Sequence, residues 1–211
     1  MGIERISTGI PGLDPLLEGG FPKGSLILLA GNPGTGKTLF TASFLYHGAI
    51  NGKRGVYVSF AEGRDAFNSY TRRMGMDFEE LEEEGKFRFL DMVTVKRDGI
   101  SAILEMILGE AHRLGAEMLA IDSYSAMAQA FRKPIEVRMT IHTILGKIVK
   151  EMGCTTILVS EVPIGSERIG MGIEEFVTDG LIKLRMGELD GRLLRDLTII
   201  KLRGTNLSER E

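Results

Sequence analysis

The sequence has few of the features that are typical of secreted, membrane-spanning or nucleic-acid-binding proteins. It contains no tryptophan and one cysteine, Cys154, which cannot form an intrachain disulfide and which we expect to be a small buried residue. No apolar run approaches the roughly 18 residues that cross a membrane, and no signal-peptide pattern opens the chain. The 26 basic and 29 acidic residues give a net charge of −3, which argues against affinity drawn mainly from nucleic-acid phosphates. We therefore expect a cytoplasmic protein with no membrane partner.

Glycine is the residue that the sequence has in excess. The 27 glycines among 211 residues compare with a typical usage of about 7%, while only 6 prolines are present, which argues against a collagen-like or linker chain. The apolar share of 43% and the charged share of 26% are typical of a globular protein. The length predicts a single domain spanning residues 1–211, whose fold requires many tight turns.

Hydrophobic periodicity predicts an α/β fold. Short apolar runs alternate with longer amphipathic segments, as in βαβ units that build a mostly parallel sheet flanked by helices. We expect strands at residues 25–30, 56–60, 87–90, 118–121, 155–159, 181–185 and 195–202, and helices at 100–114 and 134–152. Gly115 and Gly153 are placed to end these two helices. Residues 187–191 are too few for a crossover helix, so the last two strands should form an antiparallel hairpin at the sheet edge.

A phosphate-binding loop follows the first of these strands and precedes a helical segment. Its eight residues, which match the pattern G-x-x-x-x-G-K-[ST], are Gly31, Asn32, Pro33, Gly34, Thr35, Gly36, Lys37 and Thr38. Glycines let successive backbone N–H groups converge on an anion, and the helix N-terminus adds its positive dipole. Lys37 should reach the β- and γ-phosphates of a nucleotide, and the Thr38 hydroxyl should ligate Mg²⁺. The alternative is a chance glycine-rich turn.

Acidic residues follow two other predicted strands. Asp122 ends the strand at 118–121, at the sheet edge where open α/β folds bind ligands, and it could hold Mg²⁺ through water. Glu62 follows the strand at 56–60 and could orient a water molecule against the γ-phosphate, or it could cap the helix that begins near Arg64. Ser160 and Glu161 follow the strand at 155–159, either as a γ-phosphate sensor or as a solvated strand end.

The chain resembles the KaiC-like group within the RecA/RadA superfamily of ATPases. The resemblance covers nearly the whole chain and is carried by residues 6–14, 19–25, 31–38, 121–123, 174–180 and 201–205. It implies a RecA-like core with a phosphate loop, and a ring, typically a hexamer, with ATP between subunits. ATP would bind at residues 34–39, including Leu39. In that family the segment containing Lys201, Leu202, Arg203 and Thr205 approaches the nucleotide of the adjacent subunit, so Lys201 and Arg203 would act in trans on the γ-phosphate.

The sequence departs from the family pattern at three places. Ala61 stands where the family usually has the first of two adjacent glutamates, so Glu62 remains and hydrolysis should be slow. The KaiC-like group is related to the cyanobacterial circadian-clock protein, one domain of which phosphorylates itself at neighbouring Ser and Thr residues. Glu175 and Phe176 occupy those positions in this chain, so the resemblance does not support self-phosphorylation. Leu207 replaces a common histidine.

The leading hypothesis is an Mg²⁺-dependent ATPase that acts as a regulatory or conformational switch in a ring of subunits, binding ATP and releasing ADP. A DNA recombinase or recombination accessory ATPase is the first alternative, supported only by basic residues at 132–133 and 166–168. Net acidity weighs against it. The second alternative is a scaffold that binds nucleotide without turning it over.

Overall fold

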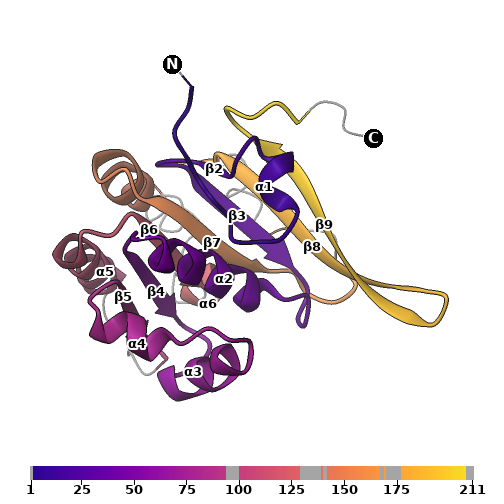
Figure 1. Cartoon of the computed structure of the whole chain (residues 1–211), viewed down its shortest axis with the longest axis horizontal. Coiled ribbons are helices and arrows are strands. Elements are labelled where there is room, and N and C mark those ends of the chain that lie inside the picture. Colours follow the sequence, from indigo (N-terminus) through magenta and orange to yellow (C-terminus); the bar gives the residue numbers. More distant parts are fainter. Residues whose placement is uncertain are drawn as a thin grey trace.

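The protein is an α/β structure with helices on both faces of a central sheet (Figure 1). The computed structural model describes residues 2–93, 100–128, 139, 142–166, 169 and 177–207. Residues 132–133, 134–138, 167–168 and 174–176, which the sequence analysis singled out, lie outside the described residues.

The described residues form a seven-stranded sheet with the order β5-β4-β6-β7-β3-β8-β9. Its strands are β3 (Leu26–Gly31), β4 (Gly55–Ser59), β5 (Phe87–Asp91), β6 (Met118–Asp122), β7 (Thr155–Glu161), β8 (Gly180–Leu189) and β9 (Arg192–Leu202). The β8–β9 pair is antiparallel, and the other neighbouring strands are parallel. The predicted fold class is therefore confirmed. A small antiparallel pair, β1 (Arg5–Ile6) and β2 (Phe21–Pro22), was not predicted.

The helices connect and cover these strands. They are α1 (Leu13–Leu16), α2 (Lys37–Ile50), α3 (Arg64–Arg73), α4 (Phe78–Glu83), α5 (Ile100–Leu114), α6 (Tyr124–Ala128) and the π-helical η1 (Ile144–Glu151). The predicted helix at 100–114 is confirmed as α5, and Gly115 follows it with φ 65°. Within the segment predicted as one helix at 134–152, the described part contains η1, whose turns are wider than those of an α-helix.

Two apolar cores lie on opposite faces of the sheet. Along β3, Leu28 belongs to one core and Leu29 to the other, because side chains alternate between the faces of a strand. The first core includes α5 and η1, and the second includes α2 and α3. Burial on both faces explains why β3 reads as a continuous apolar run rather than as an alternating one.

The C-terminal hairpin is longer than predicted. The predicted antiparallel hairpin at the sheet edge is confirmed, but the connection expected at 187–191 is too long, because β8 continues to Leu189 and β9 begins at Arg192. The turn consists of Asp190 and Gly191, with φ 53° and 72°. An Asp-Gly pair favours such a two-residue turn, whose backbone twist matches that of the flanking strands. The end of the hairpin projects beyond the rest of the sheet (Figure 1), and Leu189 and Leu193 are exposed there.

Cys154 is fully buried beside the start of β7, as the sequence predicts. Burial raises the pKa of its thiol to about 12, since desolvation disfavours the thiolate. We expect iodoacetamide to leave the folded protein unmodified at neutral pH and to alkylate Cys154 after denaturation, as measured by mass spectrometry. Rapid labelling of the folded chain would contradict this burial.

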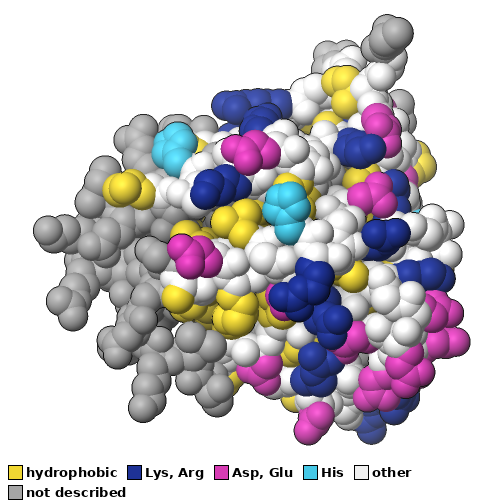
Figure 2. Space-filling view, turned by 90° about the vertical axis from the view of Figure 1, so that its left-hand side faces the viewer, with side chains coloured by type: hydrophobic (Ala, Val, Ile, Leu, Met, Phe, Trp, Pro, Cys, Tyr) yellow, Lys and Arg dark blue, Asp and Glu magenta, His cyan; other side chains and the backbone are white. Residues whose placement is uncertain are grey.

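The described surface carries charges of both signs. Figure 2 shows basic and acidic side chains close together on the face that lies at the left of Figure 1. Among the helices that the structure describes, none is long and apolar enough to cross a membrane. The run of glutamates at 79–84 belongs largely to α4 and its C-terminus, where Asp77 accepts hydrogen bonds from the first-turn N–H groups of Glu79 and Glu80.

Candidate functional site

The predicted phosphate loop connects the end of β3 to the start of α2. Gly34 and Gly36 have φ of 81° and 97°, a left-handed backbone that other residues rarely adopt. The ammonium group of Lys37 lies inside the loop, where it donates hydrogen bonds to the carbonyl oxygens of Gly31 and Asn32, both at 2.9 Å. The loop therefore curls around the side chain that was predicted to contact phosphates.

The segment after β7 anchors this loop. The Asn32 side-chain amide donates to the carbonyl oxygens of Val162 and Pro163 at 3.0 and 3.1 Å. The N–H of Val162 donates to the Gly31 carbonyl at 3.0 Å. Asn32, a variable position of the loop pattern, thus has a structural role here.

Thr38 and Asp122 lie in direct contact, although 84 residues separate them. The Thr38 hydroxyl donates to Asp122 Oδ2 at 2.7 Å, and the Tyr57 hydroxyl donates to the same oxygen at 2.6 Å. Asp122 reaches this position because β6 ends beside β4, and its side chain is largely buried. Both residues predicted to bind the metal are therefore brought together at the carboxyl edge of the sheet.

Glu62 is half-buried just beyond the end of β4. The Ser59 hydroxyl donates to the Glu62 carbonyl at 2.6 Å and accepts from its N–H at 3.1 Å. The Tyr70 hydroxyl of α3 donates to Glu62 Oε1 at 2.8 Å. Glu62 precedes Gly63, the N-cap residue of α3, so it does not itself occupy the N-cap position.

Burial shifts the ionisation of several groups in this region. Desolvation lowers the pKa of Lys37, while the negative charges of Glu161 and Asp122 act to raise it. Desolvation also raises the pKa of Glu62, and the hydrogen bond from Tyr70 opposes that shift. The pKa of Tyr57 is well above its ordinary value, first because the phenol is buried and then because Asp122 is negative. Tyr57 therefore stays protonated and can donate to Asp122.

Ser160 and Glu161 lie at the end of β7, next to the loop. Glu161 is exposed and pairs in register with Gly31, while Ser160 is buried and pairs with Ala30. The N–H of Glu161 donates to Ser125 Oγ at 2.6 Å. Glu161 is thus a solvated strand end beside the loop, whereas Ser160 is buried.

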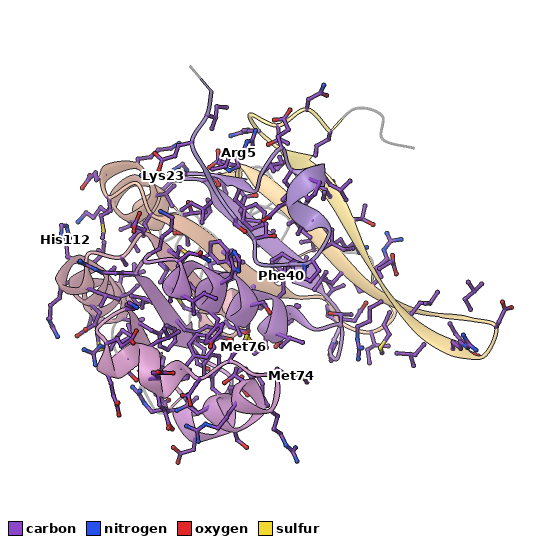
Figure 3. All side chains as sticks on the ribbon, viewed as in Figure 1. Arg5, Lys23, Phe40, Met74, Met76 and His112 are labelled. Carbon is purple, nitrogen blue, oxygen red and sulfur yellow. The ribbon has the colours of Figure 1, made fainter. Side chains whose placement is uncertain are left out.

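An apolar pocket of about 330 Å³ opens beside the first turn of α2. Leu39, which the family resemblance assigned to nucleotide binding, lines it together with Thr35 and Gly36. The remaining lining residues come from the N-terminal segment, α2, β8 and β9: Ile10, Pro11, Phe40, Ser43, Leu184, Arg195, Asp196 and Leu197. Figure 3 labels Phe40 near the start of α2. A flat apolar group attached to phosphates in the loop would have a place to bind here.

The segment predicted to act in trans lies away from its own phosphate loop. Leu202 pairs with Gly180, which pairs with Ile27 near the start of β3, whereas the loop follows the end of β3. Lys201 donates to the Thr178 carbonyl at 2.7 Å. The Arg203 side chain is 64% exposed, and its guanidinium nitrogen lies 3.6 Å from Asp179 Oδ1. The structure thus places this segment at the opposite edge of the sheet from the loop of the same chain.

Arg5 holds the end of this segment. Its guanidinium donates to Thr205 Oγ1 at 2.8 Å and to the Gly204 carbonyl at 2.7 Å. It also donates to the Gly20 carbonyl at 3.1 Å. Figure 3 shows Arg5 between the N-terminal segment and the stretch that follows β9. Arg5 therefore holds Thr205 close to the start of the chain. The sequence did not predict this contact because the two residues lie far apart in the chain.

His112 lies apart from these groups, near the C-terminal end of α5. Figure 3 shows His112 on the outer side of α5, and it is exposed to solvent. Among the residues for which the structure gives a placement, no cluster of three or more His, Cys, Asp or Glu side chains could hold a metal ion.

A mostly parallel sheet with a phosphate loop after a central strand and an acidic residue ending another strand is typical of a phosphate-loop nucleotide-binding domain. Residues 6–211 match the family model of the KaiC ATPase, and the chain belongs to this family.

Relatives and a solved structure agree with this membership. A UPF0273 protein of Methanocaldococcus jannaschii is 33% identical, covering 98% of this chain and 90% of its own length. A UPF0273 protein of Thermotoga maritima is 33% identical, covering 99% of this chain and 90% of its own length. The crystal structure of the KaiC-like protein PH0186 from Pyrococcus horikoshii is similar with a TM-score of 0.86 and 38% identity, covering 99% of this chain and 93% of that one.

Sequence reasoning missed two tyrosines and one wall of the pocket. Tyr57 reads as an ordinary core residue of a strand, and Tyr70 as an apolar position of a helix. The Ile10–Pro11 wall belongs to one of the stretches that carried the family resemblance, so a signal for it was present.

Proposed function

We propose that this chain binds ATP with Mg²⁺ and hydrolyses it slowly, as a regulatory or conformational switch in a ring of subunits. The observation that carries the proposal is the 2.7 Å contact between Thr38 and Asp122. It joins the end of the phosphate loop to the acidic strand end, the two halves that a nucleotide-hydrolysing site requires.

Binding would use the backbone of the loop and the side chain of Lys37. The N–H groups around Gly34 and Gly36 and the N-terminus of α2 supply positive potential for phosphates. The Lys37 ammonium, already inside the loop, would exchange its two carbonyl partners for phosphate oxygens. The nucleoside would lie in the apolar pocket lined by Leu39.

The donor set at Thr38 and Asp122 fits Mg²⁺. Both side chains offer hard oxygen ligands, and Mg²⁺ in nucleotide sites takes few protein ligands and completes its shell with phosphate oxygens and water. Thr38 would ligate the ion directly and Asp122 through water. The ion would neutralise charge that develops on the phosphates.

Hydrolysis would depend on Glu62 as the group that orients a water molecule. Burial raises its pKa toward the range in which a carboxylate accepts a proton efficiently. The absence of a second carboxylate at Ala61 supports slow turnover, with ADP and phosphate as products.

The proposed site is completed by a neighbouring subunit. If residues 1–211 form a single domain, Lys201 and Arg203 lie far from the phosphate loop of the same chain. Each chain would therefore present these two residues to the loop of the next chain in a ring, typically a hexamer. A trans arginine can accelerate phosphoryl transfer by about 10³ to 10⁵.

Mixed rings test this arrangement. Lys37→Ala and Arg203→Ala chains should each be inactive alone, because one lacks the loop cation and the other the trans guanidinium. When the two are co-expressed, about a quarter of the interfaces combine an intact loop with an intact Arg203, so phosphate release should reappear. The measurement is Mg-ATP hydrolysis by the purified mixture.

The matched control pairs Lys37→Ala with the double variant Lys37→Ala, Arg203→Ala, in which no interface has an intact loop. Restored activity in the control, or none in the mixture, would contradict action in trans. Stimulation by single-stranded DNA that is lost at high salt would favour the recombinase alternative. Tight ATP binding without turnover would favour the scaffold.

A further inference from the structure

Two carboxylates of the candidate site, Asp122 and Glu62, each accept a hydrogen bond from a tyrosine hydroxyl. Tyr57 donates to Asp122 at 2.6 Å, and Tyr70 donates to Glu62 at 2.8 Å. The ring of Phe67 packs against both tyrosines, with centroid separations of 4.6 Å to Tyr57 and 5.6 Å to Tyr70. Phe67 is fully buried, so the three rings form a fixed aromatic group under the site.

Glu62 is held at its backbone and at its side chain. Ser59 bonds to both the carbonyl and the N–H of Glu62, which fixes where the residue leaves β4. The side chain could still rotate about its own torsions, and the Tyr70 hydroxyl is the group that restrains it. Because Ala61 offers no carboxylate, the orientation of this one side chain determines where a water molecule would be held.

We infer that Tyr70 is a positioning residue that holds the Glu62 carboxylate in the orientation needed to direct the attacking water. The inference rests on the proposed function. Tyr70 acts through Glu62, since its hydroxyl contacts that carboxylate, and α3 fixes the tyrosine against Phe67.

The charge of Glu62 depends on this contact. Desolvation raises the pKa of the carboxyl group, the Tyr70 hydrogen bond lowers it, and the negative charge of Asp122 on β6 raises it further. On the side of β5, Asp91 Oδ2 lies next to Gly63. The guanidinium of Arg64 on α3 forms an ion pair with Glu82 and donates to the Phe89 carbonyl at 2.9 Å. Without the phenol hydroxyl, the pKa of Glu62 would rise and the base would become protonated at higher pH.

The test compares the wild-type chain with Tyr70→Phe in Mg-ATP hydrolysis across pH. Phenylalanine keeps the ring contact with Phe67 and removes only the hydroxyl. We expect kcat to fall about tenfold with KM for ATP unchanged, because the interaction serves the transition state. We also expect the acidic limb of the kcat profile to move about one unit to higher pH. Tyr46→Phe is the matched control, since Tyr46 is also half-buried and packs edge-on against Phe78.

A double variant separates positioning from a general structural effect. In the Glu62→Gln background, Tyr70→Phe should cause no further loss of activity. An equal rate and pH profile for wild type and Tyr70→Phe, or a further loss in the Glu62→Gln background, would overturn the inference while wild-type hydrolysis upholds the proposed function. If the wild type itself releases no phosphate, the proposed function fails, and the inference fails with it.

Discussion

Replacing Lys37 by alanine is expected to weaken Mg-ATP binding by at least about 100-fold and to stop hydrolysis. The loss is this large because the variant would leave the buried phosphate charge without its ammonium partner. The Lys37 ammonium is the cation inside the loop, 9% exposed, and the backbone N–H groups alone cannot replace its charge. Titration calorimetry with Mg-ATP and a phosphate-release assay measure the two effects.

Lys53→Ala is the control for this variant. Lys53 forms a partly exposed ion pair with Glu117 at 3.0 Å, and it lies beyond the C-terminal end of α2, away from the loop. Its removal should leave binding and turnover unchanged. Since Lys37 also bonds to two loop carbonyls, thermal unfolding of both variants should be compared. Wild-type affinity in a folded Lys37→Ala protein would contradict the assigned site.

Replacing Glu62 by glutamine is expected to lower kcat by about 10² to 10³ while ATP binding is retained, since a positioned base contributes this much to proton transfer. Glutamine keeps the shape of the side chain and a carbonyl oxygen for Tyr70, but it cannot accept a proton. Single-turnover phosphate release and equilibrium ATP binding, measured on the same sample, separate the two effects.

Glu161→Gln tests the competing carboxylate. Glu161 also ends a strand beside the loop, opposite Gly31, but it is exposed. We expect this variant to keep most of the wild-type rate. A large loss with Glu161→Gln and none with Glu62→Gln would transfer the role of base to Glu161.

The sequence predicted the sheet and the loop because those features leave local patterns. Buried parallel strands read as apolar runs, and β6 was predicted to within one residue of its end at Asp122. The loop pattern predicted a helix next to the loop, and α2 begins at Lys37. Thr38 and Asp122 were expected near each other because both were predicted to hold the same Mg²⁺ ion, but their direct hydrogen bond was not predicted.

Other features depend on contacts between distant segments and could not be predicted. The hydroxyl of Tyr57 reaches Asp122 across 65 residues, and nothing in an apolar strand pattern distinguishes that tyrosine from a core residue. The connection between the last two strands was predicted to start at Gly187, which made it too long. The Asp190–Gly191 pair, which forms the turn, was the better signal. Thr205 is held by Arg5, and sequence patterns do not report such pairing between the two ends of a chain.

Release of inorganic phosphate from Mg-ATP by the purified wild-type chain tests the central claim most directly. The account predicts a slow, linear release that is proportional to protein concentration, requires Mg²⁺ and is absent from Lys37→Ala. Equal release by the wild type and Lys37→Ala, or no release above the buffer blank, would contradict it.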